Sequence, residues 1–331
     1  MKVTKGLNSP ERRWLGMIPL FDPADGTTIL APDGEGVGHW KGACSAVYDD
    51  EAGKFYLYYR VRSPRPIRGG ECRIAESTDG IGFTDIWSAT KEDFETTSIE
   101  RSALIKCLDG KWRLYVSYVD PKDNRWRTDM LEAEHPRNFT PKNRKKIFTA
   151  DDIDGEGVKD PYVIIVGGLY YMILSYATKP IFQDEDKLGV MHDTADVYNT
   201  GVCKSSTGLG ISHDGVNFTW LGDIFAPGDS GWDSYASRIG TVVYTPPVFT
   251  ALYDGSIDVS ENYEEKTGLA ISYNLKDFQR ITPEGPALTS PYGSGSLRYV
   301  DVVAFKDELF YYYEMARPDG SHELRLNRVK R

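Results

Sequence analysis

The sequence predicts an all-β fold, a five-bladed β-propeller whose blades are four-stranded antiparallel sheets. A short opening strand recurs along the chain, and a turn and an aromatic strand follow it, as in a β-hairpin. A third strand and a short strand containing Phe complete several of these copies. The 21 Tyr, 13 Phe and 7 Trp residues also favour pleated sheet. Because a repeated unit determines the architecture, we expect a single domain over residues 1–331.

The repeated segments define five blades. The third strand is clearest in segments 72–77, 208–212 and 268–272, and a turn and a Phe follow each of them. The opening strands are expected at 45–48, 102–105, 161–164, 239–244 and 299–303, and the aromatic strands at 54–60, 111–118, 169–176 and 308–313. The predicted blades span about 38–90, 98–148, 156–226, 230–284 and 293–331.

The two ends of the chain suggest how the fold closes. The last blade stops after its third strand, at residues 322–329, and so lacks an outer strand. Near the other terminus, the apolar stretch 14–21 belongs to no blade. We expect this N-terminal segment, about residues 10–22, to pair as the outer strand of the last blade and so protect an open sheet edge.

One segment interrupts the repeats. Residues 178–204 lie between the second and third strands of the third blade, where a short hairpin loop is expected. Long loops in compact domains are usually functional or disordered. We interpret the segment as a lid or an arm that contacts a partner. It is rich in polar and aromatic residues, among them Asp186, His192, Asp193, Asp196 and Tyr198.

Charge and hydropathy narrow the function. A formal net charge of −10 argues against a nucleic-acid-binding protein, which needs a basic face to neutralise phosphates. The chain has neither an apolar run of the roughly 20 residues that a membrane helix needs nor a leader-like N-terminus. We therefore expect a soluble, cytoplasmic protein without membrane partners, or a secreted or periplasmic one whose leader has been removed. The oligomeric state stays open.

The four cysteines do not suggest a zinc site. They show no CxxC spacing and no neighbouring histidine pattern, so buried thiols are the favoured interpretation. They are Cys44, Cys72, Cys107 and Cys203.

The starts of the opening strands carry the candidate site. In a propeller these strands line the central channel, so polar residues at their starts converge on one cavity. Two facing carboxylates there suit glycosidic bond cleavage, in which one acid protonates the leaving oxygen and the other activates water or attacks directly. The alternative is a solvated rim of charges with aromatic residues that only pack. The candidate catalytic acids are Glu100, Asp160, Asp233 and Asp301. The candidate substrate-binding residues are Trp40, Lys41, Arg101, Lys159, Tyr235, Arg238 and Arg298, with Tyr299 as a further stacking surface.

At these residues the chain resembles the five-bladed glycoside hydrolases and phosphorylases of families 43, 32 and 130. The start 159–161, Lys-Asp-Pro, is similar to their recurring Asp-Pro signature, and 99–101, Ile-Glu-Arg, is similar to the Glu-Asp-Pro-Arg element of the mannoside phosphorylases. Two departures stand out: Arg101 occupies the place of the phosphorylase catalytic Asp, and the first blade has no Asp in its opening strand. The fourth-blade pattern is matched by Trp232-Asp233, Ile239-Gly240, Pro246-Pro247 and Tyr253-Asp-Gly255.

The resemblance implies a glycoside hydrolase that acts on a small glycan or oligosaccharide and needs no organic cofactor. We expect Asp160 and Glu100 to divide the acid and base roles, while Asp233 or Asp301 tunes a pKa or holds a sugar hydroxyl. Phosphorolysis at the same site is the nearest alternative, and a non-catalytic carbohydrate-binding propeller is another.

The cations at the strand starts leave three interpretations open. Lys41, Arg101, Lys159, Arg238 and Arg298 could bind inorganic phosphate or the carboxylate of a uronic acid, because arginine forks suit both anions, or they could neutralise the neighbouring acids. A central metal ion is a separate hypothesis, with His39 as its candidate ligand.

Overall fold

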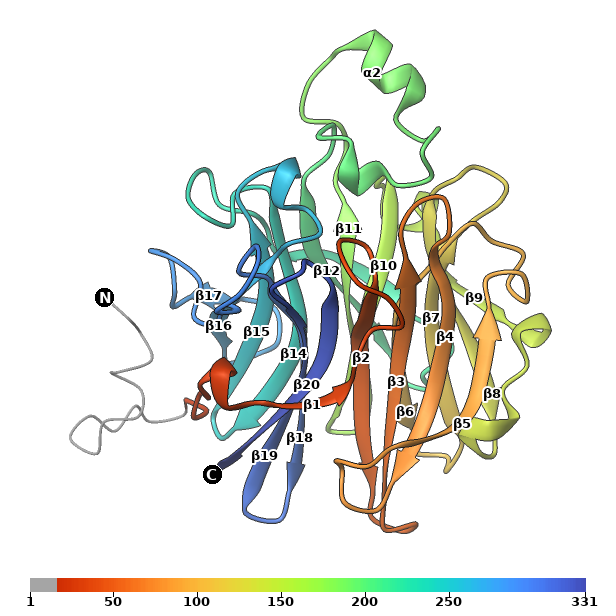
Figure 1. Ribbon diagram of the computed structural model, residues 1–331. Helices are drawn as coiled ribbons and strands as arrows, with labels where there is room; N and C mark the ends of the chain where they lie inside the picture. The colour runs from red at the N-terminus through yellow and green to blue at the C-terminus, as the bar shows by residue number, and fades with distance from the viewer. Residues whose placement is uncertain (1–16) are drawn as a thin grey trace.

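The computed structural model describes residues 17–331, and these form an all-β protein, as the sequence predicts (Figure 1). The strands form successive antiparallel units of four. Within a unit, strands that are consecutive in sequence pair with each other. The first unit is β2 (Trp40–Asp49), β3 (Lys54–Ser63), β4 (Arg68–Ser77) and β5 (Thr84–Thr90), and the second is β6 (Ile99–Lys106), β7 (Trp112–Val119), β8 (Trp126–Ala133) and β9 (Lys145–Phe148).

The remaining units repeat this order. The third is β10 (Gly157–Val166), β11 (Leu169–Ala177), β12 (Ser205–Ser212) and β13 (Thr219–Phe225), and the fourth is β14 (Ala236–Thr245), β15 (Val248–Ser256), β16 (Lys266–Ser272) and β17 (Gln279–Arg280). The last is β18 (Leu297–Phe305), β19 (Glu308–Ala316), β20 (His322–Lys330) and β1 (Thr27–Leu30). The helical segments are η1 (Pro23–Asp25), η2 (Pro136–Asn138), η3 (Pro141–Asn143), η4 (Asp151–Ile153), α2 (Glu185–Val190), η5 (Val197–Asn199) and η6 (Val259–Glu261).

The first strands of the units face one another. Contacts run from β2 to β6, from β6 to β10, from β10 to β14, from β14 to β18 and from β18 back to β2. Aromatic and aliphatic side chains fill the space between neighbouring units; Tyr58 and Ile74 of the first unit, for example, pack with Leu104, Leu114 and Tyr118 of the second. The first strands therefore surround a common axis, and the core lies between the sheets.

Each first strand has an irregularity at an equivalent place. Its register against the second strand shifts between Gly42 and Ser45, Ile99 and Ser102, Lys159 and Tyr162, Ile239 and Thr241, and Arg298 and Asp301. A β-bulge leaves one strand with an extra residue and redirects its side chain. Ala43, Asp160 and Tyr299 lie in these bulges with φ of 50°, 54° and 52°, in the left-handed region. The bulges thus determine which side chains of the first strands point toward the common axis.

A repeated turn follows the third strand. In the Ser-x-Asp-Gly turn at residues 212–215, Asp214 Oδ1 accepts the backbone N–H groups of Val216 and Asn217 at 2.8 Å, and Ser212 Oγ accepts that of Gly215 at 3.0 Å. The turn at residues 77–80 has the same bonds. Side-chain oxygens that satisfy backbone donors in this way explain why one short motif recurs between successive hairpins.

The closing strand lies later in the sequence than we predicted. β1 pairs antiparallel with β20, Thr27 opposite Leu326, whereas residues 17–22 form no strand and residues 10–16 lie outside the described part. Ile18, Leu20 and Phe21 are instead buried in the core against the last unit. Proline has no N–H for a sheet ladder, and Pro19 lies among these apolar residues while Pro23 follows them, which accounts for the packing without strand pairing.

The insertion at residues 178–204 leaves β11 and returns to β12. It carries α2, which projects beyond one end of the sheets (Figure 1). All four cysteines are buried and unpaired, which confirms the interpretation as buried thiols. In the described part of the chain, no helix has the length and apolar character needed to cross a membrane.

Candidate functional site

Glu100 lies in the bulge of β6 and is almost fully buried, with 2% of its surface exposed. Its Oε2 pairs with Arg60 of β3, and its Oε1 lies 3.5 Å from Nη1 of Arg62. The hydroxyl of Tyr299 lies 3.5 Å from Oε2. Burial alone would raise the pKa of this carboxyl, but Arg60, Lys159 and Arg62 together lower it. Glu100 is therefore an ionised carboxylate at neutral pH.

Asp160 occupies the corresponding bulge of the neighbouring strand β10 and is 4% exposed. Its backbone N–H donates to Oγ of Ser117 at 3.1 Å, which holds the left-handed conformation in place. Oδ2 lies 3.2 Å from Nζ of Lys159, yet neither carboxylate oxygen accepts a hydrogen bond from the described residues. Burial and the charge of Glu100 raise the pKa of Asp160, although Lys159 opposes them. The two carboxyls are thus shifted in opposite directions.

Tyr299 of the β18 bulge lies close enough to both carboxyls to feel their charges. Burial and the charges of Asp160 and Glu100 raise the pKa of its phenol, which stays protonated. The guanidiniums of Arg298 and Arg60 lie 4.8 and 5.7 Å from the ring centre. Its backbone N–H donates to both oxygens of Asp254, at 3.0 and 3.2 Å. Burial, with Glu265 nearby, raises the pKa of Asp254 to about 7.

Two of the predicted substrate-binding arginines are held in a buried ion-pair network. Arg298 donates to Glu314 Oε1 at 2.7 and 2.9 Å and to Glu265 Oε2 at 2.5 Å. Arg238 donates to Glu265 Oε1 at 2.5 Å, and also to Asn262 and Ser205. All three nitrogens of each guanidinium therefore donate to side chains of the protein.

Trp40 is likewise enclosed. Its ring stacks on that of His322 at 4.6 Å, and the guanidiniums of Arg62 and Arg298 lie 4.6 and 4.9 Å from its centre. His322 also contacts Glu314 through Nδ1 and Glu264 through Nε2, at 2.9 and 3.1 Å. Trp40 therefore belongs to the same buried cluster as Glu100.

Arg101 and Asp301 lie at the axis but bond to backbone. Arg101 donates through Nε to the carbonyl of Cys44 at 2.9 Å and through Nη1 to that of Gly240 at 2.6 Å. Asp301 accepts from the N–H of Ala46 at 2.8 Å and from the hydroxyl of Thr241 at 3.1 Å. These bonds connect β6 and β18 to β2 and β14, so both side chains hold the first strands together.

Other candidates lie apart from the carboxyl pair. Among the contacts of residues 17–331, none joins Asp233 or Asp301 to Glu100 or Asp160. Asp233 Oδ2 accepts from Arg280 at 2.6 Å and from Tyr253 at 3.0 Å.

Lys41 and His39 also lie outside these contacts. Lys41 pairs with Asp33 at 2.5 Å. The carbonyl of His39 accepts the N–H of His322 at 3.1 Å. Within residues 17–331, no three His, Cys, Asp or Glu side chains come together in a way that could hold a metal ion, so the His39 hypothesis gains no support.

The insertion packs beside Lys159, the neighbour of Asp160, through Tyr198. Tyr198 donates to the carbonyl of Gly157 at 3.0 Å, and its ring lies 4.8 Å from Nζ of Lys159 and 5.2 Å from the guanidinium of Arg238. Tyr235, a predicted binding residue, donates to the carbonyl of Tyr198 at 2.7 Å and so supports the insertion.

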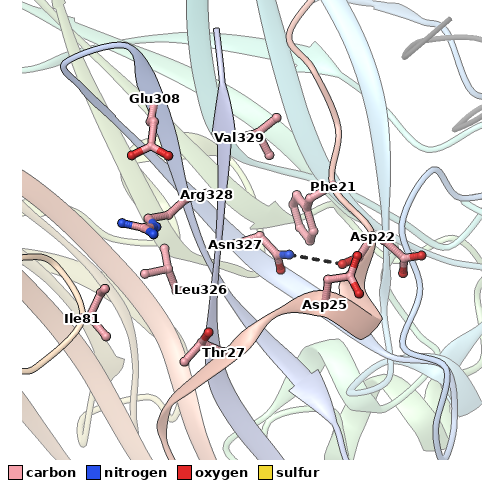
Figure 2. Close-up of a pocket in the computed structure, with 10 residues that line it drawn as sticks. All are labelled: Phe21, Asp22, Asp25, Thr27, Ile81, Glu308, Leu326, Asn327, Arg328 and Val329. Carbon is pink, nitrogen blue, oxygen red and sulfur yellow. Dashed lines mark hydrogen bonds between the residues drawn. The ribbon is translucent and has the colours of Figure 1, made fainter.

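Figure 2 shows a pocket of about 430 Å³ elsewhere in the molecule, beside the closing strand. Phe21, Asp22 and Asn327 are among its lining residues, and Asn327 Nδ2 donates to the carbonyl of Asp22 at 3.2 Å. None of the predicted site residues lines this pocket.

Sequence reasoning missed several members of the buried cluster. Arg60, Arg62 and Glu314 lie on second strands, and Glu265 and His322 lie at or just before strand starts. The available signal was a charge inside an otherwise aromatic strand, as in Tyr-Tyr-Arg-Val-Arg at 58–62 and Tyr-Tyr-Tyr-Glu at 311–314. Such a charge must point at a partner, because a buried unpaired charge is too costly.

Comparison with solved structures identifies the architecture. A glycosyl hydrolase from Bacteroides ovatus aligns over 96% of both chains at 15% identity, with a TM-score of 0.64. A β-1,2-mannobiose phosphorylase from Listeria innocua aligns over 92% of this chain and 94% of its own, at 15% identity and a TM-score of 0.62. The chain has the fold of glycoside hydrolases and glycoside phosphorylases.

A third structure with this fold comes from the family 130 mannoside phosphorylases, described as containing glycoside hydrolases that target β-1,2 mannosidic linkages in Candida mannan. It is 16% identical and covers 90% of this chain and 85% of its own, with a TM-score of 0.60. The glycoside hydrolase and phosphorylase resemblance seen in the sequence is thus supported at the level of the fold. No family model matches the chain, and no curated protein matches it in sequence.

Proposed function

We propose that the chain is a five-bladed propeller glycoside hydrolase that cleaves a glycosidic bond in a small glycan or oligosaccharide, with Asp160 and Glu100 as its catalytic carboxyls. The observation that carries the proposal is the position of two buried carboxyls in equivalent bulges of neighbouring first strands, and the opposite directions of their pKa shifts support it. Pairs of acids with diverging pKa values are typical of acid and base assignments in enzymes. The successive four-stranded units and the circle of contacts among their first strands support the propeller.

In this mechanism Asp160 is the acid. Its raised pKa keeps the proton that the leaving oxygen receives, and Lys159 then stabilises the carboxylate that remains. Glu100 is the ionised partner, which either attacks the anomeric carbon or activates water. Its ion pair with Arg60 keeps it charged, and the Tyr299 hydroxyl is placed to orient it.

The hydrogen bonds that Arg298, Arg238 and Arg101 already make within the protein favour hydrolysis over phosphorolysis. A phosphorylase needs free guanidinium or ammonium donors for inorganic phosphate. Arg298 donates to Glu314 and Glu265, Arg238 donates to Glu265, Asn262 and Ser205, and Arg101 donates through Nε and Nη1 to backbone carbonyls, so these predicted cations have few donors left for phosphate. We therefore propose water, rather than phosphate, as the acceptor, and require no organic cofactor.

The test compares sugar release from a panel of short oligosaccharides with and without inorganic phosphate. Wild type should release sugar at the same rate in both, and Asp160→Asn and Glu100→Gln should each lose about a thousandfold or more, since general acid catalysis alone contributes about 10²- to 10⁴-fold. Asp233→Asn is the matched control, because Asp233 contacts Arg280 and Tyr253 instead, and it should keep most of the activity. Release that depends on phosphate would establish a phosphorylase. Binding without release by wild type would establish a non-catalytic propeller.

A further inference from the structure

Two arginines of the β3–β4 hairpin contact a carboxylate from the insertion, and a third, Arg62, lies beside Tyr263, which contacts the same carboxylate. Oδ2 of Asp196 lies 3.3 Å from Nη2 of Arg68 and 3.6 Å from Nη2 of Arg65, and it accepts the hydroxyl of Tyr263. Arg62 lies with its guanidinium 4.4 Å from the ring centre of Tyr263. We call Arg62, Arg65, Arg68 and Tyr263 the hairpin anion site.

Two guanidiniums of this site are buried but donate few hydrogen bonds. Arg68 is 3% exposed and Arg62 is 6% exposed. Nε and Nη2 of Arg68 and Nε of Arg62 donate no hydrogen bond to the described residues, and the Arg62 bond to Glu100 is long at 3.5 Å. In Arg298, by contrast, all three nitrogens donate to carboxylates. Buried donors without acceptors are costly, so their accumulation at one place points to a ligand.

Two residues at this contact, Arg68 and Ala195, have left-handed backbones. Arg68 has φ of 60°, and Ala195, which precedes Asp196, has φ of 53°. Nη1 of Arg68 donates to the carbonyl of Ala195 at 3.1 Å. Left-handed conformations of residues other than glycine are uncommon and gather at functional sites. The guanidinium of Arg68 and the carboxylate of Asp196 therefore meet at a place where the backbone of both segments is left-handed.

The hairpin anion site adjoins the proposed catalytic carboxyls. Arg62 contacts Glu100 directly. Elsewhere in the site, the ring of Trp126 lies near both Arg68 and Lys159, 5.6 Å from the guanidinium and 5.3 Å from Nζ. Lys159 in turn pairs with Asp160. A sugar held between Glu100 and Asp160 would therefore have a neighbouring sugar, or its own substituent, within reach of these arginines.

We propose that the hairpin anion site binds the carboxylate of an acidic sugar in the substrate, and that Asp196 occupies this place while the insertion is closed. The inference rests on the proposed function and adds the substrate class. The arginine fork matches a carboxylate in geometry and charge, and Asp196 is itself a carboxylate bound there. An entering acidic sugar replaces one carboxylate by another and leaves no buried guanidinium without a counter-charge.

Titration calorimetry with D-glucuronate tests the binding, with D-glucose as the neutral control and inorganic phosphate as the second anion. Wild type should bind glucuronate but not glucose. Asp196→Ala should bind it roughly tenfold more tightly, the factor for one weak ion pair, because the competing carboxylate is gone. Arg68→Gln and Arg62→Gln should each lose the binding, and Arg137→Gln, an exposed arginine pairing with Glu76, should keep it. Glucuronate binding that survives Arg68→Gln, or binding of phosphate alone, would overturn the proposal.

Activity separates this inference from the proposed function. An acidic oligosaccharide should be cleaved faster than its neutral counterpart, and Arg68→Gln should remove the preference without abolishing cleavage of the neutral one. Cleavage of neutral glycans only, with no effect of Arg68→Gln, refutes the acidic substrate and leaves the hydrolase intact. Absence of any cleavage beside intact glucuronate binding refutes the hydrolase alone.

Discussion

The carboxylate of Glu100 pairs with the guanidinium of Arg60 where both side chains are essentially inaccessible to solvent. Removing one partner of a buried pair leaves the other charge without compensation, which costs about 3–5 kcal/mol. If Glu100 is removed, Arg60 retains a second contact, 3.5 Å from Glu314, which reduces the loss of stability. The pair therefore serves stability as well as the proposed chemistry.

Glu100→Gln should accordingly lower the free energy of unfolding by about 3 kcal/mol. The measurement is urea denaturation, read as a shift of the midpoint at constant slope. Glu51→Gln is the control, because Glu51 pairs with Lys106 while 85% of its side chain is exposed, and it should change stability by less than about 1 kcal/mol. Equal effects of the two substitutions would contradict the buried pair.

The pH profile of the activity follows from the raised pKa of Asp160 and the lowered pKa of Glu100. Asp160 must be protonated, so activity falls as pH rises through its raised pKa. Glu100 must be ionised, so activity falls as pH drops through its lowered pKa. We expect kcat/KM to stay high in mildly acidic solution and to decline on the alkaline side. A profile measured from about pH 4 to about pH 9, the range that brackets carboxyl and His values, checks this. Maximal activity at the alkaline end would reverse the two assignments.

Stability should also depend on pH through Asp254. In the unfolded chain this carboxyl ionises near its ordinary value, whereas burial and Glu265 raise its folded pKa to about 7. The folded state holds the extra proton, so this contribution is full below the unfolded pKa and is lost as pH rises toward 7. Asp254→Asn keeps an acceptor for the Tyr299 N–H and removes the titration. The decline in unfolding free energy between about pH 4 and about pH 7 should be smaller in the variant than in wild type. The same change of unfolding free energy with pH in wild type and variant would refute the role of Asp254.

Gly215 and Gly53 provide a matched pair for the repeated turn. Both are left-handed, with φ of 70° and 63°. A methyl group on Gly53 would meet no atom within 4 Å, whereas on Gly215 it would lie 2.7 Å from Arg113 Nη1 and 2.9 Å from Tyr170. Gly53→Ala should therefore cost about 1 kcal/mol of backbone strain, and Gly215→Ala a further 1–3 kcal/mol or so for overpacking. Thermal unfolding checks the order; a similar loss for both would remove the packing argument.

The sequence revealed features that repeat and missed those that depend on long-range contacts. Aromatic second strands are visible because their periodicity is local, and Glu100 and Asp160 are visible because they occupy the same place in successive repeats. Glu314 lies opposite Arg298 on the next strand of the same unit, and Glu265 comes from the fourth unit, so no short sequence pattern connects either of them to Arg298. The prediction misplaced the closing strand because Thr27–Leu30 is only 4 residues long and has a weak sequence pattern. The apolar residues before it are more conspicuous in the sequence, but they are buried in the core and form no strand.

The pairing of Thr27 with Leu326 also has a consequence for biosynthesis. A ribosome delivers β1 long before its partner β20, so the last sheet cannot be completed until β20 has been synthesised. Contacts between such distant segments close the largest loops in a chain and are slow to form. The nascent protein must therefore keep an unpaired strand waiting while earlier units fold, and this interval is when it is most exposed to aggregation and to chaperones.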